Sequence, residues 1–267
     1  MGKNWGGGTT LASIAVLIVF LAAWEWLPVL AKIPQFILPP PSRVWEEFLR
    51  MSANDRLWYH AGITSMEVVV GFVLGSLLGI VIGFILGMAP RAEVVLSPYI
   101  LALQIAPKVA FAPLFVMWFG YTIYPKIVVA VLIVFFPVMI NVLGSVRTID
   151  PQMINLAQSF SASRWQIFRK IEFPASMPPL FAGLRIGSTL AVIGVVVGEL
   201  VGGNTGLGYL LVFGEGQANT AMVFVTIILL TVIGIIAYVA VILLERRVLH
   251  YMPRRKLGID SDQGGKS

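Results

Sequence analysis

The chain has 267 residues, of which 58% are hydrophobic and only 12% charged, and its mean hydropathy is +0.88. A soluble domain carries about 25% charged residues, so lipid must be the solvent for much of this chain. The sequence contains no cysteine, which excludes disulfides, thiolate metal sites and cysteine nucleophiles. The net charge is +6. Because the positive residues lie beside apolar stretches, we interpret them as charges that orient the chain in a membrane.

A bilayer span needs about 20 apolar residues, and such stretches recur along the whole chain. We predict six spans, at residues 11–31, 68–88, 94–119, 126–146, 179–201 and 222–244. The third is interrupted at Ala106-Pro107-Lys108, and the fourth is kinked near Pro137. The first is longer than the apolar part of a signal peptide, so we expect a retained helix. This pattern predicts an all-α, polytopic membrane protein with six transmembrane helices.

The placement of lysine and arginine predicts the orientation. With both termini in the cytoplasm, the inner segments hold twelve Lys and Arg residues and the outer segments five, Lys126 among them. Two more lie within spans. Positive charge is enriched on the cytoplasmic side of membrane proteins, so we expect both termini inside.

One segment between the first two spans does not cross the membrane. Residues 41–51 mix Val44, Trp45 and Phe48 with charged residues, after Ser42 as a plausible N-cap. This pattern is typical of a short amphipathic helix lying on the outer membrane surface.

Glycine recurs every four residues along the second span, at Gly71, Gly75, Gly79, Gly83 and Gly87. Small residues at this spacing let helix backbones approach closely in lipid, where the hydrophobic effect does not drive association. Each four-residue step turns about 400°, so the stripe drifts around the helix. We therefore expect a packing helix that is wedged between several neighbours.

The longest cytoplasmic loop, residues 150–174, contains two short helical patterns. Asp150 is a plausible N-cap with Pro151 at the first helical position, and Pro174 is expected to stop the second helix. Apolar residues recur at helical spacing in each pattern: Ile154, Ala157 and Phe160 in the first, and Trp165, Phe168 and Ile171 in the second. Two readings stay open, a helix pair lying on lipid headgroups and a docking knob for a soluble partner.

This loop resembles the EAA loop of ABC importer permeases, in which a small-residue turn is followed by R-W-x-x-F-x-x-I-x-x-P, here Arg164 to Pro174. Further segments, in order, resemble the nitrate, sulfonate and taurine permease group of the binding-protein-dependent importers: Phe36 to Trp45, Ala112 to Gly120, Phe136 to Asn141, Gly183 to Gly187 and Gly206 to Gly208. Within that group, Ile105 to Ala110 and Phe119 to Ile127 look closer to permeases for riboflavin and for thiamin pyrimidine precursors.

The resemblance implies a type-1 ABC importer transmembrane domain in the bacterial inner membrane. It implies a homodimer, two ATP-binding subunits and an extracytoplasmic solute-binding protein. The expected ATPase-docking residues are Asn155, Ala157, Ser161, Ala162, Arg164, Trp165, Phe168 and Pro174. Two of them depart from the motif, because Asn155 replaces its glutamate and Ser161 its central glycine. We expect a first region at residues 1–57, a permease core at 58–245 and a basic cytoplasmic tail at 246–267.

Charged residues inside spans are costly in lipid and are functional candidates by default. Lys108 follows Pro107 in the interrupted third span and is a candidate for the translocation pathway, as is Glu199 in the fifth. The alternative for Glu199 and for Arg185 is that they snorkel to the membrane surface. We assign no role to Glu67.

The sequence offers no catalytic set and no metal site, and we expect no cofactor. His60 and His250 are the only histidines and lie far apart in the chain. ATP hydrolysis is therefore expected on a partner subunit. The rival interpretation, an autonomous channel or secondary transporter, would need no docking knob and would normally show inverted repeats.

Overall fold

The computed structural model describes residues 7–54 and 56–251, and every regular element in these two ranges is a helix. Five helices are long and apolar enough to cross a membrane, and a bent pair adds a sixth crossing if it counts as one span. The long helices are α1 (Gly7–Leu30), α3 (Leu57–Gly87), α6 (Ile123–Arg147), α9 (Phe173–Gly202) and α11 (Thr220–Val248). The prediction of an all-α, polytopic membrane protein is confirmed.

The third predicted span is the bent pair. Helix α4 (Pro90–Ile105) ends at the predicted interruption, and a 3-10 turn (Lys108–Phe111) leads into α5 (Ala112–Phe119). The two halves meet at 76°. Pro107 lacks the N–H that a continuous helix would need, which explains why the helix breaks there. In α6, by contrast, the helix continues through Pro137.

The structure corrects two expected boundaries and adds one short helix. Helix α3 begins at Leu57, well before the apolar run that predicted it, because a hydropathy window misses the polar first turns. Helix α2 (Pro41–Asn54) is the expected amphipathic helix, but Ser42 lies inside it and is not its N-cap. A short helix, α10 (Leu207–Gly216), was not predicted at all.

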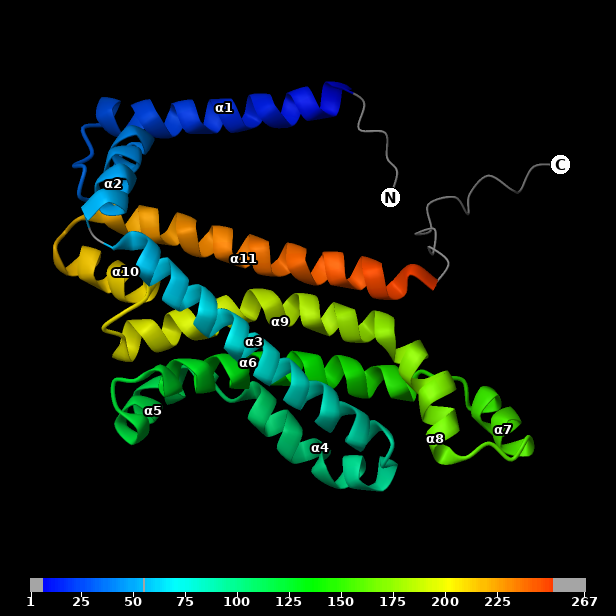
Figure 1. Cartoon of the computed structure of the whole chain (residues 1–267). Helices are drawn as coiled ribbons and strands as arrows, with labels where there is room; N and C mark the ends of the chain where they lie inside the picture. The colour runs from blue at the N-terminus through cyan, green and yellow to red at the C-terminus, as the bar shows by residue number, and fades with distance from the viewer. Residues whose placement is uncertain (1–6, 55, 252–267) are drawn as a thin grey trace.

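Helices α3, α6 and α9 pack against one another and form the centre of the bundle (Figure 1). All five glycines of the predicted stripe face α6. Added Cβ atoms would come within 2.6 to 3.0 Å of atoms of α6, at Ala130, Val134, Val138, Val142 and Val146 among them. Helix α3 lies between several neighbours as expected, since it also contacts α2, α4, α9 and α10. The stripe itself faces α6, because its partners on α6 also advance by four residues and the two i+4 ridges follow each other.

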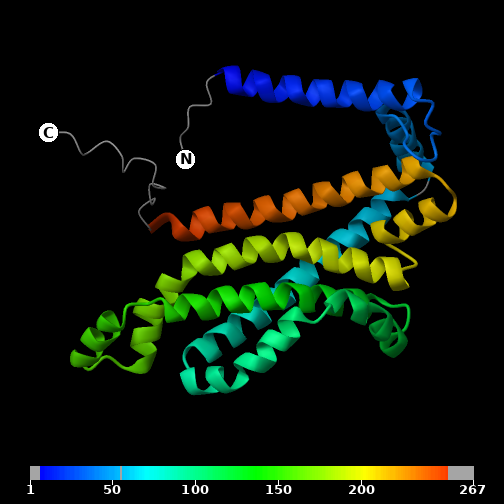
Figure 2. The ribbon, with the colours of Figure 1, turned by 180° about the vertical axis from the view of Figure 1, so that it is seen from behind.

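The bundle has two distinct ends (Figures 1 and 2). Helices α2, α5 and α10 lie at one of them, here called the α10 end. Helices α7 (Pro151–Ser159) and α8 (Arg164–Ile167) lie at the other, here called the α7 end. A short 3-10 turn, η3 (Leu249–Tyr251), closes the described chain, and most of the expected basic tail lies outside the described residues.

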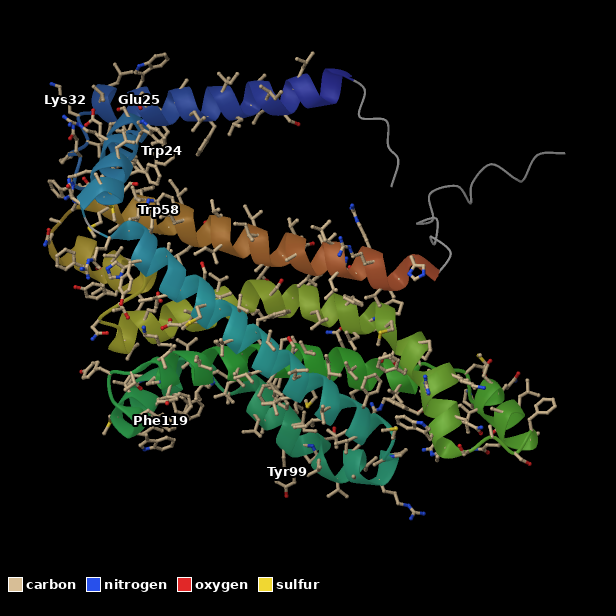
Figure 3. The ribbon with its side chains drawn as sticks, in the orientation of Figure 1. Trp24, Glu25, Lys32, Trp58, Tyr99 and Phe119 are labelled. Carbon is tan, nitrogen blue, oxygen red and sulfur yellow. The ribbon has the colours of Figure 1, made fainter. Side chains whose placement is uncertain are left out.

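Near its C-terminal end, helix α1 is held against α2, α11 and the segment before α2 (Figure 3). The Trp24 indole N–H donates to the Pro39 carbonyl at 3.1 Å, and the Glu25 carboxylate accepts from the Ser42 hydroxyl at 2.7 Å. The ring of Trp24 also packs against Phe224 of α11. Residues 11–21 are all exposed, so most of α1 presents apolar side chains to its surroundings.

Candidate functional sites

The helix pair at the α7 end is held by its own capping residues. The Asp150 carboxylate accepts from the Gln152 N–H at 2.8 Å, as the sequence predicted. Ser163 caps α8 through a capping box, in which its hydroxyl accepts from the Gln166 N–H and the Gln166 side chain accepts from the Ser163 N–H. Such reciprocal caps satisfy backbone donors that a helix start leaves free. We call residues 150–172 the knob.

Ser161 turns the chain between α7 and α8 with a φ of 57°. The neighbouring N–H of Ala162 donates to the Ala157 carbonyl at 3.0 Å, which closes the end of α7. Glycine adopts this left-handed conformation at no steric cost, whereas a residue with a Cβ is strained there. The motif's glycine is therefore replaced at the one position of the loop where its conformational freedom is needed.

Pro174 does not stop the second helix, contrary to prediction. The chain runs from α8 through a π-helical turn (Phe168–Glu172) directly into α9. Pro174 follows the π-helical turn directly and lies inside one continuous helical run from Arg164 to Gly202. The knob is thus continuous with a membrane-spanning helix, and a force on the knob acts on α9 without an intervening loop.

Apolar side chains cover the outer surface of the knob. Phe160 is 80% exposed and Trp165 is 66% exposed, and Met153 and Leu156 are also exposed. Of the expected docking residues, Asn155, Arg164 and Ser161 are exposed, while Ala157, Ala162, Phe168 and Pro174 are half-buried. Ile167, which the predicted apolar face omitted, is the buried anchor of α8 at 2% exposure.

An aromatic chain leads from this surface into the bundle. The Trp165 ring stacks on Phe168 with centroids 5.5 Å apart. Phe168 in turn meets the edge of Phe84 in α3 at 5.4 Å. Arg164 adds polar links, since its guanidinium lies 3.6 Å from Glu172 and donates to the Met88 carbonyl at 3.5 Å. The knob therefore contacts the α3–α4 turn as well as α9.

Lys108 lies at the bend between α4 and α5 and is half-buried. Its ammonium donates to the carbonyls of Gln104 and Ala106, which the break in the helix leaves available. It also lies 4.7 Å above the ring of Phe136 in α6. A cation over an aromatic face is electrostatically favourable.

Three ionisable side chains meet inside the bundle near the α10 end. Lys126 of α6 forms an ion pair with Glu67 of α3, with Nζ 2.9 Å from Oε1, and both side chains are buried. Lys126 also donates to the Thr205 carbonyl at 3.1 Å. The third is Glu199 of α9, which is 1% exposed. Its interpretation as a snorkelling residue is wrong, because protein surrounds it.

The backbone between α9 and α10 is fastened to this cluster. Glu199 accepts from the Thr64 hydroxyl at 2.7 Å and from the Gly208 N–H at 2.6 Å. Thr64 also accepts from the Leu207 N–H at 2.8 Å, and His60 Nδ1 accepts from the Gly206 N–H at 3.0 Å. The first N–H groups of α10, which no helical carbonyl satisfies, thus bind side chains of α3 and α9.

The remaining charged candidate within a span, Arg185, lies 3.4 Å from Glu245 of α11 and is partly exposed. Among the described residues, no group of three or more His, Asp or Glu could hold a metal ion. Glu67, Lys126 and Thr64 were not predicted as site residues, although the sequence holds one signal for them. A glutamate within an apolar span requires a partner, and Lys126 begins another span.

Residues 71–250 match the family model described as the binding-protein-dependent transport system inner membrane component. The chain belongs to this family. It is 39% identical over 235 residues to a riboflavin transport system permease protein of Chloroflexus aurantiacus, covering 88% of each chain. It is 31% identical over 238 residues to a formylaminopyrimidine transport permease protein of Halalkalibacterium halodurans, covering 89% of this chain and 94% of the relative.

Two further similarities concern the range of solutes named for the relatives and the fold of the family. A taurine transport system permease protein of Escherichia coli is 30% identical over 241 residues, covering 88% of each chain. An inward-facing structure of the MetNI methionine ABC transporter superposes with a TM-score of 0.63 at 19% identity, covering 73% of this chain and 98% of that one. The chain therefore has the fold of a type-1 ABC importer transmembrane domain, and its relatives are permease subunits rather than ATPases.

Proposed function

We propose that this permease imports a small organic nutrient, with riboflavin or a thiamin pyrimidine precursor as the favoured solute. The named riboflavin and formylaminopyrimidine relatives support this choice, as do the segments 105–110 and 119–127. Sulfonate, taurine and nitrate are the other candidates within the group. The observation that carries the proposal is the exposed apolar knob, which is continuous with α9 and so suits a chain driven by a soluble ATPase.

The working assembly would contain two copies of this chain, two ATP-binding subunits and an extracytoplasmic solute-binding protein. Each ATPase would receive one knob, with Trp165 and Phe168 as apolar anchors and Arg164 at the rim. The contact of Phe168 with Phe84 supports a path for motion from the ATPase to α3. In this assembly residues 1–57 form an accessory region, 58–245 the permease core and 246–267 a cytoplasmic tail.

The knob and both termini would face the cytoplasm of a bacterium, and α10 would face the outside. The excess of Lys and Arg in the inner segments supports this orientation. Reporter fusions after Ala89 and after Ser161 should report cytoplasm, and a fusion after Tyr121 should report the outside. An outside signal after Ser161 would remove the basis for ATPase docking.

Substrate would pass between two copies of the core, and Lys108 is the residue proposed to face this pathway. Its partly exposed ammonium, which the described structure pairs with carbonyls and a ring but with no carboxylate, supports that role. Glu199, the second candidate, is so enclosed by Thr64 and Gly208 that it would act by shaping the α10 end.

Reconstitution tests the proposal directly. Vesicles containing the permease and its cognate ATP-binding subunit should take up radiolabelled riboflavin or formylaminopyrimidine only with ATP and the binding protein present. Taurine uptake under the same conditions would reassign the solute. Uptake by the permease alone would instead favour the rival, an autonomous channel or secondary transporter.

A further inference from the structure

The buried cluster at the α10 end contains more negative than positive groups. Glu67, Lys126 and Glu199 come from three different helices, and each is at most 3% exposed. With both carboxyl groups ionised, the cluster would carry one uncompensated negative charge. Burying an unpaired charge is far more costly than burying a neutral polar group.

The other titratable groups near the cluster do not supply the missing positive charge. His60 of α3 accepts the Gly206 N–H at Nδ1, so this nitrogen carries no proton and the imidazole is neutral. Arg56 is the N-cap residue of α3 and is exposed, so its charge is solvated outside the cluster. The charged residue of α10, Glu215, lies at the far end of that helix. Lys126 is therefore the cation within the cluster.

One atom of the cluster also lacks a hydrogen-bond donor. Glu67 Oε1 receives the Lys126 ammonium, but Glu67 Oε2 has no donor in the described structure although the side chain is 1% exposed. Glu199 faces the same place in the bundle: Thr64, three residues before Glu67 on α3, donates to Glu199, and Gly198, its neighbour on α9, packs against Lys126. Leaving such a buried acceptor unsatisfied costs about 1–3 kcal/mol.

We propose that Glu199 binds a single proton and donates it to Glu67 Oε2. The proton satisfies the oxygen that lacks a donor and makes the cluster neutral, with Glu67 and Lys126 as its ion pair. Glu199 is the holder because its partners are the Thr64 hydroxyl and the Gly208 N–H, neither of which carries a charge. Glu67 stays ionised because Lys126 contacts it directly.

The proton closes a clamp on the backbone between α9 and α10. Lys126 holds the Thr205 carbonyl, and Glu199 holds the Gly208 N–H. Gly206, with a φ of 107°, lies so close that an added Cβ would overlap the Glu199 carboxyl group. Loss of the proton would place two negative carboxylates in contact beneath this segment. The α10 end should therefore loosen as the pH rises.

Infrared spectroscopy of the full-length permease in lipid vesicles can detect the proton. At neutral pH the wild type should show the C=O stretch of a protonated carboxylic acid, which disappears on raising the pH. The band should be absent in Glu199→Gln, because this variant lacks the carboxyl group that binds the proton. It should also be absent in Glu67→Gln, because Glu199 then ionises to compensate the charge of Lys126. The control Glu93→Gln, a buried acid paired with Arg147 near the α7 end, should keep the band.

Melting curves then assign the proton to one carboxyl. Glu199→Gln imitates the protonated acid and should keep the neutral-pH melting temperature of the wild type while losing its decline at alkaline pH. Glu67→Gln breaks the ion pair and should melt several degrees lower. A wild type without the band overturns the proposal whether or not the variants fold. The reverse order of the two melting temperatures overturns the assignment to Glu199.

Discussion

Gly79 of α3 lies directly against Val138 of α6, so that a Cβ atom on Gly79 would stand 3.0 Å from the Val138 Cβ and 2.8 Å from the Phe135 carbonyl oxygen. The second of these neighbours is backbone, which cannot rotate away. The two helices therefore approach as closely as their backbones allow, and any side chain at this position must push them apart.

Gly79→Ala should lower the stability of the purified permease by about 1–3 kcal/mol, the usual range for overpacking. The matched control is Gly62→Ala in the same helix, where an added Cβ would meet no atom within 4 Å. Alanine is the better helix former, so the control should be neutral or slightly stabilising. Thermal unfolding in detergent measures both, and equal melting temperatures would contradict the close approach.

Ser161→Gly should stabilise the knob by about 1 kcal/mol, because glycine adopts the left-handed turn without steric strain. Ser159→Gly is the control, since Ser159 is the last residue of α7 and has no positive φ, so glycine relieves no strain there and only lowers helix propensity. Amide hydrogen exchange across residues 150–172 measures the effect. Slower exchange in Ser161→Gly and faster exchange in Ser159→Gly are expected. Faster exchange in both variants would show that Ser161 bears no strain.

Lys108→Cys tests whether the bend between α4 and α5 faces a hydrated pathway. The chain has no native cysteine, so a single introduced thiol reports alone. It should react with water-soluble thiol reagents, at a rate that changes when nucleotide binds the assembled transporter. Val129→Cys, at a fully buried position of α6, should stay unreactive. Inertness of Lys108→Cys in every nucleotide state would instead indicate a packed, structural lysine.

Features that depend on a few neighbouring residues could be predicted from the sequence. The cap at Asp150 and the break at Pro107 follow from the chemistry of a few neighbouring residues, and the structure has both. The prediction that Pro174 ends the second helix of the knob was wrong, also for a local reason. A π-helical turn precedes this proline, and nothing in the pattern of apolar residues signals it.

The buried cluster could not be predicted in the same way. Glu67 and Lys126 are 59 residues apart in sequence, and their pairing depends on how α3 and α6 align. Hydropathy locates each helix along the chain but does not specify which faces meet. The same limit explains why the glycine stripe was recognised as a packing surface while its single partner, α6, was not.

Trp165→Ala should separate the permease from its ATPase without damaging the permease itself. Trp165 is 66% exposed, so its removal costs the isolated fold little. Buried aromatic anchors at protein interfaces typically cost about 2 kcal/mol or more when truncated, which corresponds to at least a roughly thirtyfold loss of affinity. Copurification of the ATP-binding subunit and ATP-driven uptake should therefore fall together, while membrane insertion stays normal.

Two control variants make this result specific to docking. Trp118→Ala removes a similarly exposed tryptophan, 64% exposed, from α5 near the α10 end and should leave ATPase copurification unchanged. Arg164→Ala should weaken copurification only mildly and in a salt-dependent way, because a charge at the rim of an interface contributes little to affinity. It also leaves the buried Glu172 carboxylate without its cation, so the variant should itself melt at a lower temperature. If Trp165→Ala retained its ATPase and transported at the wild-type rate, the docking hypothesis would be wrong. The knob would then be a helix pair resting on lipid headgroups, the alternative interpretation of its exposed apolar side chains.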